Sequence, residues 1–214
     1  IYLKGKKNMV HALNNINLKI DDRETVAIIG ESGAGKSTLL HIMSCIDNFD
    51  GEYYLDNIDI NKLSESKKSK LRSSKIGIVL QDFALIDDFT VFENVMTPLY
   101  FNKKIKDKKG SVMRALKKTG IVSLKAKKVS QLSGGQKQRV AISRALVTSP
   151  EYIFADEPTG SLDSKTSEEI VKMLFDLNRN GITIVIVTHN LEIANQCHHI
   201  IEIKDGNIIK DICS

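Results

Sequence analysis

The sequence predicts an α/β domain with a mostly parallel sheet, a small antiparallel β part and a mostly helical insertion. Short apolar runs typical of buried strands alternate with segments of helical periodicity, which favours βαβ units and parallel pairing. One internal stretch is almost entirely helical in its spacing and separates two strand-rich parts. We therefore expect a single domain over residues 1–214, with a core of about 1–81 and 151–214 and a helical subdomain of about 82–150.

The first part of the chain predicts mainly strands. The apolar run before Gly30 is continuous, as in a buried central strand, and the spacing after the following glycine-rich loop is helical. In chain order we expect strands over 11–20 and 25–29, a helix over 36–47, a short strand pair over 51–60 and a buried strand over 76–80.

The second part begins with helical spacing over Val91–Leu146, interrupted near Pro98 and at several glycines. Strands over 152–155 and 182–187 then enclose a helix over 165–178, which is a βαβ unit. The turn residues Asp205-Gly206-Asn207 predict a last hairpin, with strands over 200–204 and 208–210.

The chain has 214 residues, of which 42% are hydrophobic and 27% charged, as in a soluble globular protein. Its apolar runs fall well short of the roughly 18 to 20 residues that cross a bilayer. The cysteines, Cys45, Cys197 and Cys213, are widely spaced and form no CxxC pair, which suits a reducing compartment.

The stretch Gly30–Ser37 matches the phosphate-binding pattern GxxxxGK[ST], between a predicted strand and a predicted helix. Its glycines allow backbone N–H groups and the helix N-terminus to surround phosphate oxygens. We expect Lys36 to reach the β- and γ-phosphates and Ser37 to bind Mg²⁺. The residues expected to line the nucleotide are Gly30, Ser32, Gly33, Ala34, Gly35, Lys36, Ser37 and Thr38.

The predicted strand Tyr152–Ala155 delivers two carboxylates, Asp156 and Glu157, at its C-terminal end, where ligands bind in open α/β sheets. We expect Asp156 to hold the Mg²⁺ coordination sphere. Glu157 is expected to orient or deprotonate an attacking water.

The order of Gly30–Thr38, Gln81, Leu132-Ser133-Gly134-Gly135-Gln136, Asp156-Glu157 and His189 resembles the nucleotide-binding domain of ABC ATPases across essentially the whole chain. The resemblance implies a P-loop NTPase fold with a RecA-like sheet core. It also implies ATPase activity with ATP and Mg²⁺, and two sites at a head-to-tail dimer interface. In each of them, the signature Leu132–Gln136 caps a nucleotide held by the phosphate loop of a second subunit.

The signature itself has the chemistry of an anion site. Gly134 and Gly135 let N–H groups approach a phosphate, Ser133 adds a hydroxyl donor, and a helix from about Gln136 to Thr148 presents its positive end. A single nucleotide is already bound by the phosphate loop of one chain. If the signature of a second chain supplies further donors, closure of the dimer would depend on the γ-phosphate.

The resemblance also assigns single residues. Gln81 is similar to the residue that touches Mg²⁺ or the lytic water and marks the hinge into the helical part. His189 resembles the histidine that holds the γ-phosphate and pairs with Glu157. Asp163 belongs to a loop that crosses the dimer interface, and Tyr2 resembles the aromatic residue that stacks on adenine. The other histidines, His11, His41, His198 and His199, show no metal spacing among themselves, and we expect them to be structural or exposed.

The motifs resemble most the branch that serves macrolide and antimicrobial-peptide export, lipoprotein release and cell-division signalling. This implies a separate integral membrane permease, and a location at the cytoplasmic face of the cell membrane through that permease. Arg23 stands where the family usually has glycine, and His198-His199 replaces a small-acid-basic run.

Other readings are a soluble ABC ATPase acting on nucleic acid or ribosomes, an envelope-signalling ATPase, and an importer ATPase. The spacing between Lys36 and Leu132 leaves no room for a chromosome-type coiled coil, and the chain has one cassette where translation-type proteins usually have two. The regulatory domain that importers often add after the last strand is not found before Ser214. A plain P-loop kinase would lack the signature.

The net charge is +5, and the basic residues gather between Lys103 and Lys128. A solvated helical face explains this best, and contact with anionic lipid is the alternative. We expect no nucleic-acid partner, because few aromatic residues interleave with these lysines.

Overall fold

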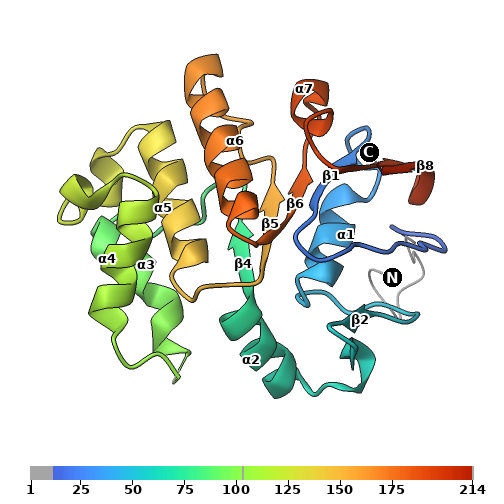
Figure 1. Cartoon of the computed structure of the whole chain (residues 1–214), viewed down its shortest axis with the longest axis horizontal. Coiled ribbons are helices and arrows are strands. Elements are labelled where there is room, and N and C mark those ends of the chain that lie inside the picture. Colours follow the sequence, from blue (N-terminus) through green and yellow to red (C-terminus); the bar gives the residue numbers. More distant parts are fainter. Residues whose placement is uncertain (1–11, 103, 214) are drawn as a thin grey trace.

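The computed structural model describes residues 12–102 and 104–213. In this part of the chain, six strands form one sheet in the order β4-β5-β6-β1-β7-β8 (Figure 1). All neighbours pair in parallel except β7 and β8, which form an antiparallel hairpin. The strands are β1 (Thr25–Ile29), β4 (Ile76–Val79), β5 (Tyr152–Asp156), β6 (Thr183–Val187), β7 (His199–Lys204) and β8 (Asn207–Cys213).

Both faces of the central strands are buried. On β5, Ile153 and Ala155 pack into one apolar core, whereas Tyr152 and Phe154 pack into a second core on the other face. The strand β6 alternates in the same way. Burial on both faces explains why these strands are continuous apolar runs in the sequence.

Helices cover the two faces unequally. The first core joins β5 and β6 to α3, α4, α5 and α6, and the second joins them to α1 and α2. In Figure 1, α3, α4 and α5 lie together at the left end, and α1 lies to the right of α6. The helices are α1 (Lys36–Met43), α2 (Glu65–Lys75), α3 (Val91–Met96), α4 (Lys108–Lys118), α5 (Gly134–Leu146), α6 (Ser164–Arg179) and α7 (Leu191–Ala194), with 3₁₀ turns over Ile60–Lys62, Thr97–Tyr100, Val122–Leu124 and Val129–Gln131.

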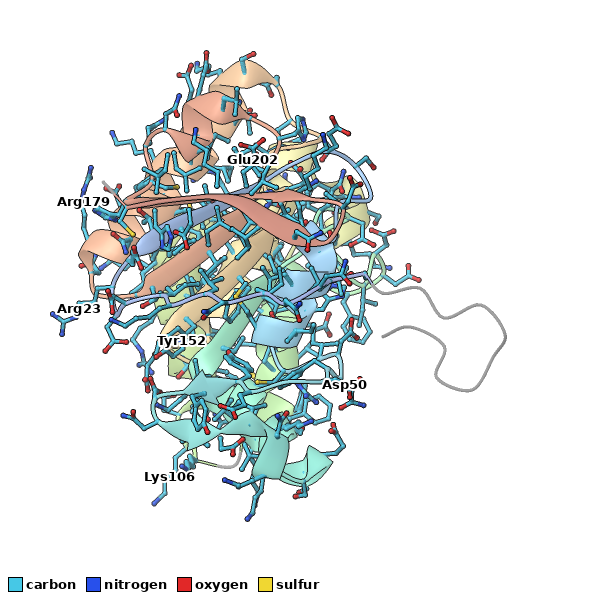
Figure 2. The ribbon with its side chains drawn as sticks, turned by 90° about the vertical axis from the view of Figure 1, so that its right-hand side faces the viewer. Arg23, Asp50, Lys106, Tyr152, Arg179 and Glu202 are labelled. Atoms are coloured by element: carbon cyan, nitrogen blue, oxygen red, sulfur yellow. The ribbon has the colours of Figure 1, made fainter. Side chains whose placement is uncertain are left out.

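Two short strands, β2 (Tyr54–Leu55) and β3 (Ile58–Asp59), pair antiparallel within the predicted stretch 51–60. Asp56 and Asn57 between them both have positive φ, the backbone geometry of a tight hairpin turn. The predicted hairpin near the C-terminus is also present, and Figure 2 shows it across the front, with Glu202 labelled. The predicted fold class is confirmed.

The strand predicted over 11–20 is wrong for residues 12–20, and His11 lies outside the described residues. Ile16, Leu18 and Ile20 pack against the core while the residues between them are exposed. The alternation therefore arises from one-sided burial, and this segment forms no strand ladder among the described residues.

Two helices are absent from the sequence-based predictions. The helix α2 is rich in lysine and serine and buries only Lys68 and Leu71, so its apolar period is too weak to recognise. The helix α7 has just four residues. Two boundaries also differ. The helix predicted over 36–47 ends at Met43, before the left-handed residue Cys45, and the signature helix begins two residues early, at Gly134.

The lysine-rich stretch is mostly solvated. Lys109, Lys117 and Lys118 of α4 are exposed, while Val112 and Leu116 on its opposite face are buried. Within the described residues, none of the helices has the length and apolar character needed to cross a bilayer.

Candidate functional site

Three polar segments meet at one edge of the sheet. Gly30 follows β1, Asp156 ends β5, and Thr188 follows β6. The three strands are parallel and adjacent in the order β5-β6-β1, so their carboxyl ends lie side by side. This is the position where open α/β sheets bind ligands.

The loop after β1 folds back on its lysine. The Nζ atom of Lys36 donates hydrogen bonds of 2.8 Å to the carbonyls of Gly30 and Glu31. Gly35 precedes α1 without a side-chain cap, so the N–H groups of the first helical turn point to the loop. A Cβ on Gly35 would lie 2.5 Å from the carbonyl oxygen of Ala12, and its φ is +106°, so only glycine fits there.

The two acids are held by backbone contacts. Asp156 is the last residue of β5 and pairs with Val187 of β6. Glu157 donates its N–H to the carbonyl of Val187 at 2.9 Å and has a φ of +43°. A non-glycine residue in this left-handed region is strained, and such residues concentrate at functional sites.

Glu157 and His189 are in direct contact. The Oε1 atom of Glu157 lies 2.9 Å from Nδ1 of His189, across the loops that follow β5 and β6. The glutamate side chain is 14% exposed and the histidine side chain 73% exposed. The carboxylate accepts a proton held on Nδ1, which directs Nε2 away from Glu157. The pairing expected from the sequence is therefore present.

Gln81 follows β4 and lies near the turn after Glu157. Its Nε2 atom is 3.5 Å from the point that a Cβ on Gly160 would occupy. Two residues further along, Phe83 and Ala84 both have positive φ. Their carbonyls accept hydrogen bonds from the Arg144 guanidinium of α5, at 2.7 Å for Phe83. Sequence reasoning missed Arg144, because its partners lie about 60 positions away.

The signature forms a capped helix start. Ser133 precedes α5, and its Oγ accepts from the N–H of Gln136 at 3.4 Å. In return, the Gln136 Oε1 accepts the N–H of Ser133 at 3.1 Å. This capping box uses the serine hydroxyl within the chain and leaves Gly134 and Gly135 to open the helix.

The signature packs against the start of α6. A Cβ on Gly135 would lie 2.4 Å from Cγ2 of Thr166. Asp163 caps α6 by accepting from the N–H of Thr166 at 3.0 Å and from its Oγ1 at 2.6 Å. The side-chain and backbone hydrogen bonds from Thr166 hold the pKa of Asp163 below its usual value. Asp163 thus lies beside the signature of its own chain.

The sheet separates the signature from the phosphate loop. Leu40 of α1 belongs to the core on one face, and Ile142 of α5 belongs to the core on the other. The carboxyl edge of the sheet therefore holds five of the predicted site residues: Lys36, Gln81, Asp156, Glu157 and His189. The signature Ser133–Gln136 opens α5, on the opposite face from α1. Asp163 lies in the loop between β5 and α6, next to residues that line the same groove as Glu157. Tyr2 lies outside the described residues.

A groove of about 880 Å³ extends from Glu157 and His189 along α6 and α7. Its lining includes Lys172, Phe175 and Gln196. The phosphate loop does not line it. Glu31, Ser32 and Gly33 of the loop are exposed, whereas Ala34 is buried.

A comparison with family models matches residues 13–160 to the ABC transporter family. The chain is 44% identical over 212 residues to the macrolide export ATP-binding/permease protein MacB of Mannheimia succiniciproducens, covering 98% of this chain and 33% of that protein. It thus spans about a third of the length of that relative. It is also 43% identical to the ABC transporter ATP-binding protein YvrO of Bacillus subtilis, covering 98% of this chain and 92% of that one.

Solved structures show the same fold. The dimeric ATP-binding cassette MJ0796 in a post-hydrolysis state, bound to ADP and Pi, superposes with a TM-score of 0.90 at 42% identity, over 99% of this chain and 94% of that chain. MJ0796 is a protein of Methanocaldococcus jannaschii.

Proposed function

The chain belongs to the ABC transporter family and is an ATPase of that family, and on this premise we propose that it works as a head-to-tail homodimer that closes on ATP and drives a separate membrane permease. One observation carries the dimer. The phosphate loop and the signature lie on helices that cover opposite faces of the sheet. A nucleotide on Lys36 therefore needs a second chain to supply Ser133, Gly134 and Gly135.

The described residues fit a nucleotide with Mg²⁺. Ser37, Gln81 and Asp156 offer hydroxyl, amide and carboxylate oxygens, the hard ligands that Mg²⁺ prefers. When bound, the ion supplies charge stabilisation at the phosphate oxygens. Lys36 and the N–H groups of its loop bind the phosphates of the same nucleotide.

Hydrolysis then needs a water placed and activated. Glu157 is the base for that water, held in its strained backbone position by Val187 and contacted by His189. The second nitrogen of His189 points away from Glu157 and serves the γ-phosphate. Asp163 supports the signature of its own chain and thereby the site of the partner.

The transport role is proposed from the relatives and from the surface. MacB is named as a macrolide export ATP-binding/permease protein, and this chain is similar to a third of it. We place the cassette at the cytoplasmic face of the membrane, driving export of an antimicrobial peptide, drug or lipoprotein. Large apolar side chains are exposed on the helical part and support docking to a permease: Ile86, Phe89, Tyr100 and Phe101.

A mixing experiment tests the dimer. Lys36→Ala removes one phosphate loop and Ser133→Arg blocks one signature, and each variant alone should lose ATPase activity. In a mixed dimer, the loop of the Ser133→Arg chain faces the intact signature of the Lys36→Ala chain, so one working site forms. ATPase activity should therefore reappear on mixing the two inactive proteins.

Activity that stays absent at every mixing ratio, while each variant still folds and the wild type dimerises, would contradict the head-to-tail arrangement. Mixing two different phosphate-loop variants, Lys36→Ala with Ser37→Ala, is the matched control and should restore nothing. The membrane protein that co-purifies with the chain identifies the permease, and recovery of a ribosome or DNA would contradict the transport role.

A further inference from the structure

We propose that Glu24, His199 and Cys213 form a zinc-binding site, at the edge of the sheet opposite the nucleotide loops. One ligand atom from each of these residues lies within 4.8 Å of the other two. They come from three places: Glu24 precedes β1, His199 begins β7 and Cys213 ends β8. Arg23, the neighbour of Glu24, is labelled at the left in Figure 2.

The histidine is the central observation. The His199 side chain is 3% exposed, and its Nδ1 atom has no hydrogen-bond partner among the described residues. A buried polar nitrogen without a partner is costly, and such atoms are rare in folded proteins. Nδ1 of His199 nevertheless lies 3.3 Å from Oε1 of Glu24. The two atoms are close but not aligned for a hydrogen bond.

The other ring nitrogen fixes the tautomer. Nε2 of His199 lies 2.5 Å from Oδ1 of Asp211, and an ionised carboxylate can only accept. Nε2 therefore donates its proton to Asp211, and a ring that carries only this proton directs the lone pair of Nδ1 toward Glu24 and Cys213. A carboxylate behind a histidine that ligates a metal is the arrangement found in zinc proteins.

The glutamate is oriented too. Its Oε2 atom accepts the N–H of Asp21 at 2.9 Å, which leaves Oε1 on the side of His199. Two of the three ligands thus have an outer partner that holds them.

The separation of the His199 nitrogen and the Glu24 oxygen suits zinc. Nitrogen and oxygen ligands about 2.0–2.2 Å from a tetrahedral Zn²⁺ lie roughly 3.3–3.5 Å apart. The observed 3.3 Å between His199 and Glu24 agrees with this value. Zinc accepts nitrogen, carboxylate oxygen and thiolate together, whereas Mg²⁺ and Ca²⁺ select oxygen ligands. With three protein ligands, water would take the fourth position.

A competing explanation is a histidinium ring held between Glu24 and Asp211 without metal. That arrangement needs a second ring proton on Nδ1 that points to Glu24, and the angle at this contact does not provide a hydrogen bond. It also gives no role to the thiol of Cys213.

Titration of nucleotide-free, reduced protein with Zn²⁺ tests the site. We expect one Zn²⁺ per chain, and a loss of affinity of more than tenfold in Glu24→Gln and in Cys213→Ser, both outside the buried core. Asp211→Asn should weaken binding by roughly 10- to 100-fold. The matched control is His41→Asn, which removes a histidine 3.5 Å from an acid, Asp47, and should leave Zn²⁺ affinity unchanged.

Thiol alkylation gives a second readout. Cys213 is exposed, whereas Cys45 and Cys197 are buried and shielded from a reagent in solution. A thiol reagent should therefore label Cys213 first, and one equivalent of Zn²⁺ should slow that labelling at least tenfold in wild type but not in Glu24→Gln. No stoichiometric Zn²⁺ uptake, or Zn²⁺ affinity unchanged by Cys213→Ser, would overturn the proposal and favour the histidinium bridge.

Discussion

Gly135 occupies a position where a methyl group has no room. A Cβ there would lie 2.4 Å from Cγ2 of Thr166, and the hydroxyl of Thr166 is already bound to Asp163. The neighbouring Gly134 is different, because its Cβ would meet Leu162 at an ordinary 3.4 Å. Packing therefore requires glycine at Gly135 but not at the adjacent Gly134.

We expect Gly135→Ala to lower the free energy of unfolding by about 1–3 kcal/mol, the usual effect of overpacking. Gly134→Ala should be neutral or stabilising by up to about 1 kcal/mol, because alanine favours a helix more than glycine. Urea unfolding measures both. The double variant Gly135→Ala/Thr166→Ser removes the clashing methyl group and keeps the hydroxyl, so it should recover most of the loss. Equal stability of the two alanine variants would show that the Thr166 contact is unimportant.

At this scale, residue types and spacing predicted the motifs but not their contacts within the chain. The phosphate loop and the two acids were predicted from their patterns beside predicted strands, and His189 was assigned from the family resemblance. The cap by Asp163 and the packing of Gly135 on Thr166 were not found, because the helices that meet there are fixed only by the tertiary fold. The cluster of Glu24 with His199 is hidden for the same reason.

A polar junction joins three elements at the other end of β5. Asp56 in the β2–β3 turn contacts Lys75 at the end of α2 at 2.5 Å, and also the hydroxyl of Tyr152 at the start of β5. Partial burial alone would raise the pKa of Asp56, but hydrogen bonds from Lys75 and Tyr152 bring it below its usual value. The ionised form is therefore the one that the fold stabilises.

Stability should depend on pH through this junction. A carboxylate whose pKa is lowered by folding contributes its full stabilisation above its unfolded pKa, which is about 4. That contribution to the free energy of unfolding is lost as the pH falls through the pKa of the folded state. Asp56→Asn should therefore cost about 1 kcal/mol at pH 7, and the gap from wild type should shrink below about pH 4. Urea unfolding at several pH values checks this. The exposed Asp50→Asn is the control and should show no gap, and a gap for Asp56→Asn that stays constant with pH would contradict the assignment.

The segment after Gln81 is pinned to the signature helix by Arg144. Removing the guanidinium in Arg144→Met should free the carbonyls of Phe83 and Ala84 and speed amide exchange in residues 82–86. The expected loss of stability is roughly 1.5–3 kcal/mol, as for hydrogen bonds to a charged group. Arg114→Met on the exposed side of α4 is the control. Unchanged exchange in Arg144→Met would mean that other contacts hold the segment.

Elements with strong patterns were predicted well, namely the βαβ unit, the buried strands and the last hairpin. The misses have physical causes. The helix α2 buries too few residues to show a period, and α7 is too short. Residues 12–20 alternate because one side packs on the core, and alternation by itself does not supply a strand partner.

At the scale of the whole molecule, the sheet separates the helix that follows the phosphate loop from the signature helix, because α1 and α5 pack on opposite faces. The carboxyl edge supplies the phosphate loop, the acids and His189, and the signature lies with α5 on the other side. One chain thus carries the motifs of an ABC ATPase, and under the proposed function a second chain is needed to bring a phosphate loop and a signature together. Only the family resemblance predicted that the signature and the phosphate loop of one nucleotide come from two chains. Motif spacing alone does not tell which face of the sheet α5 covers.

The most direct test is the oligomeric state of Glu157→Gln with ATP. Loss of the base should reduce turnover by roughly 10²- to 10⁴-fold, so ATP stays bound between two chains. Sedimentation should then show a stable dimer with two ATP per dimer, and the double variant Lys36→Ala/Glu157→Gln should remain monomeric. A Glu157→Gln protein that is monomeric in saturating ATP, or that hydrolyses ATP at the wild-type rate, would contradict the head-to-tail ATPase.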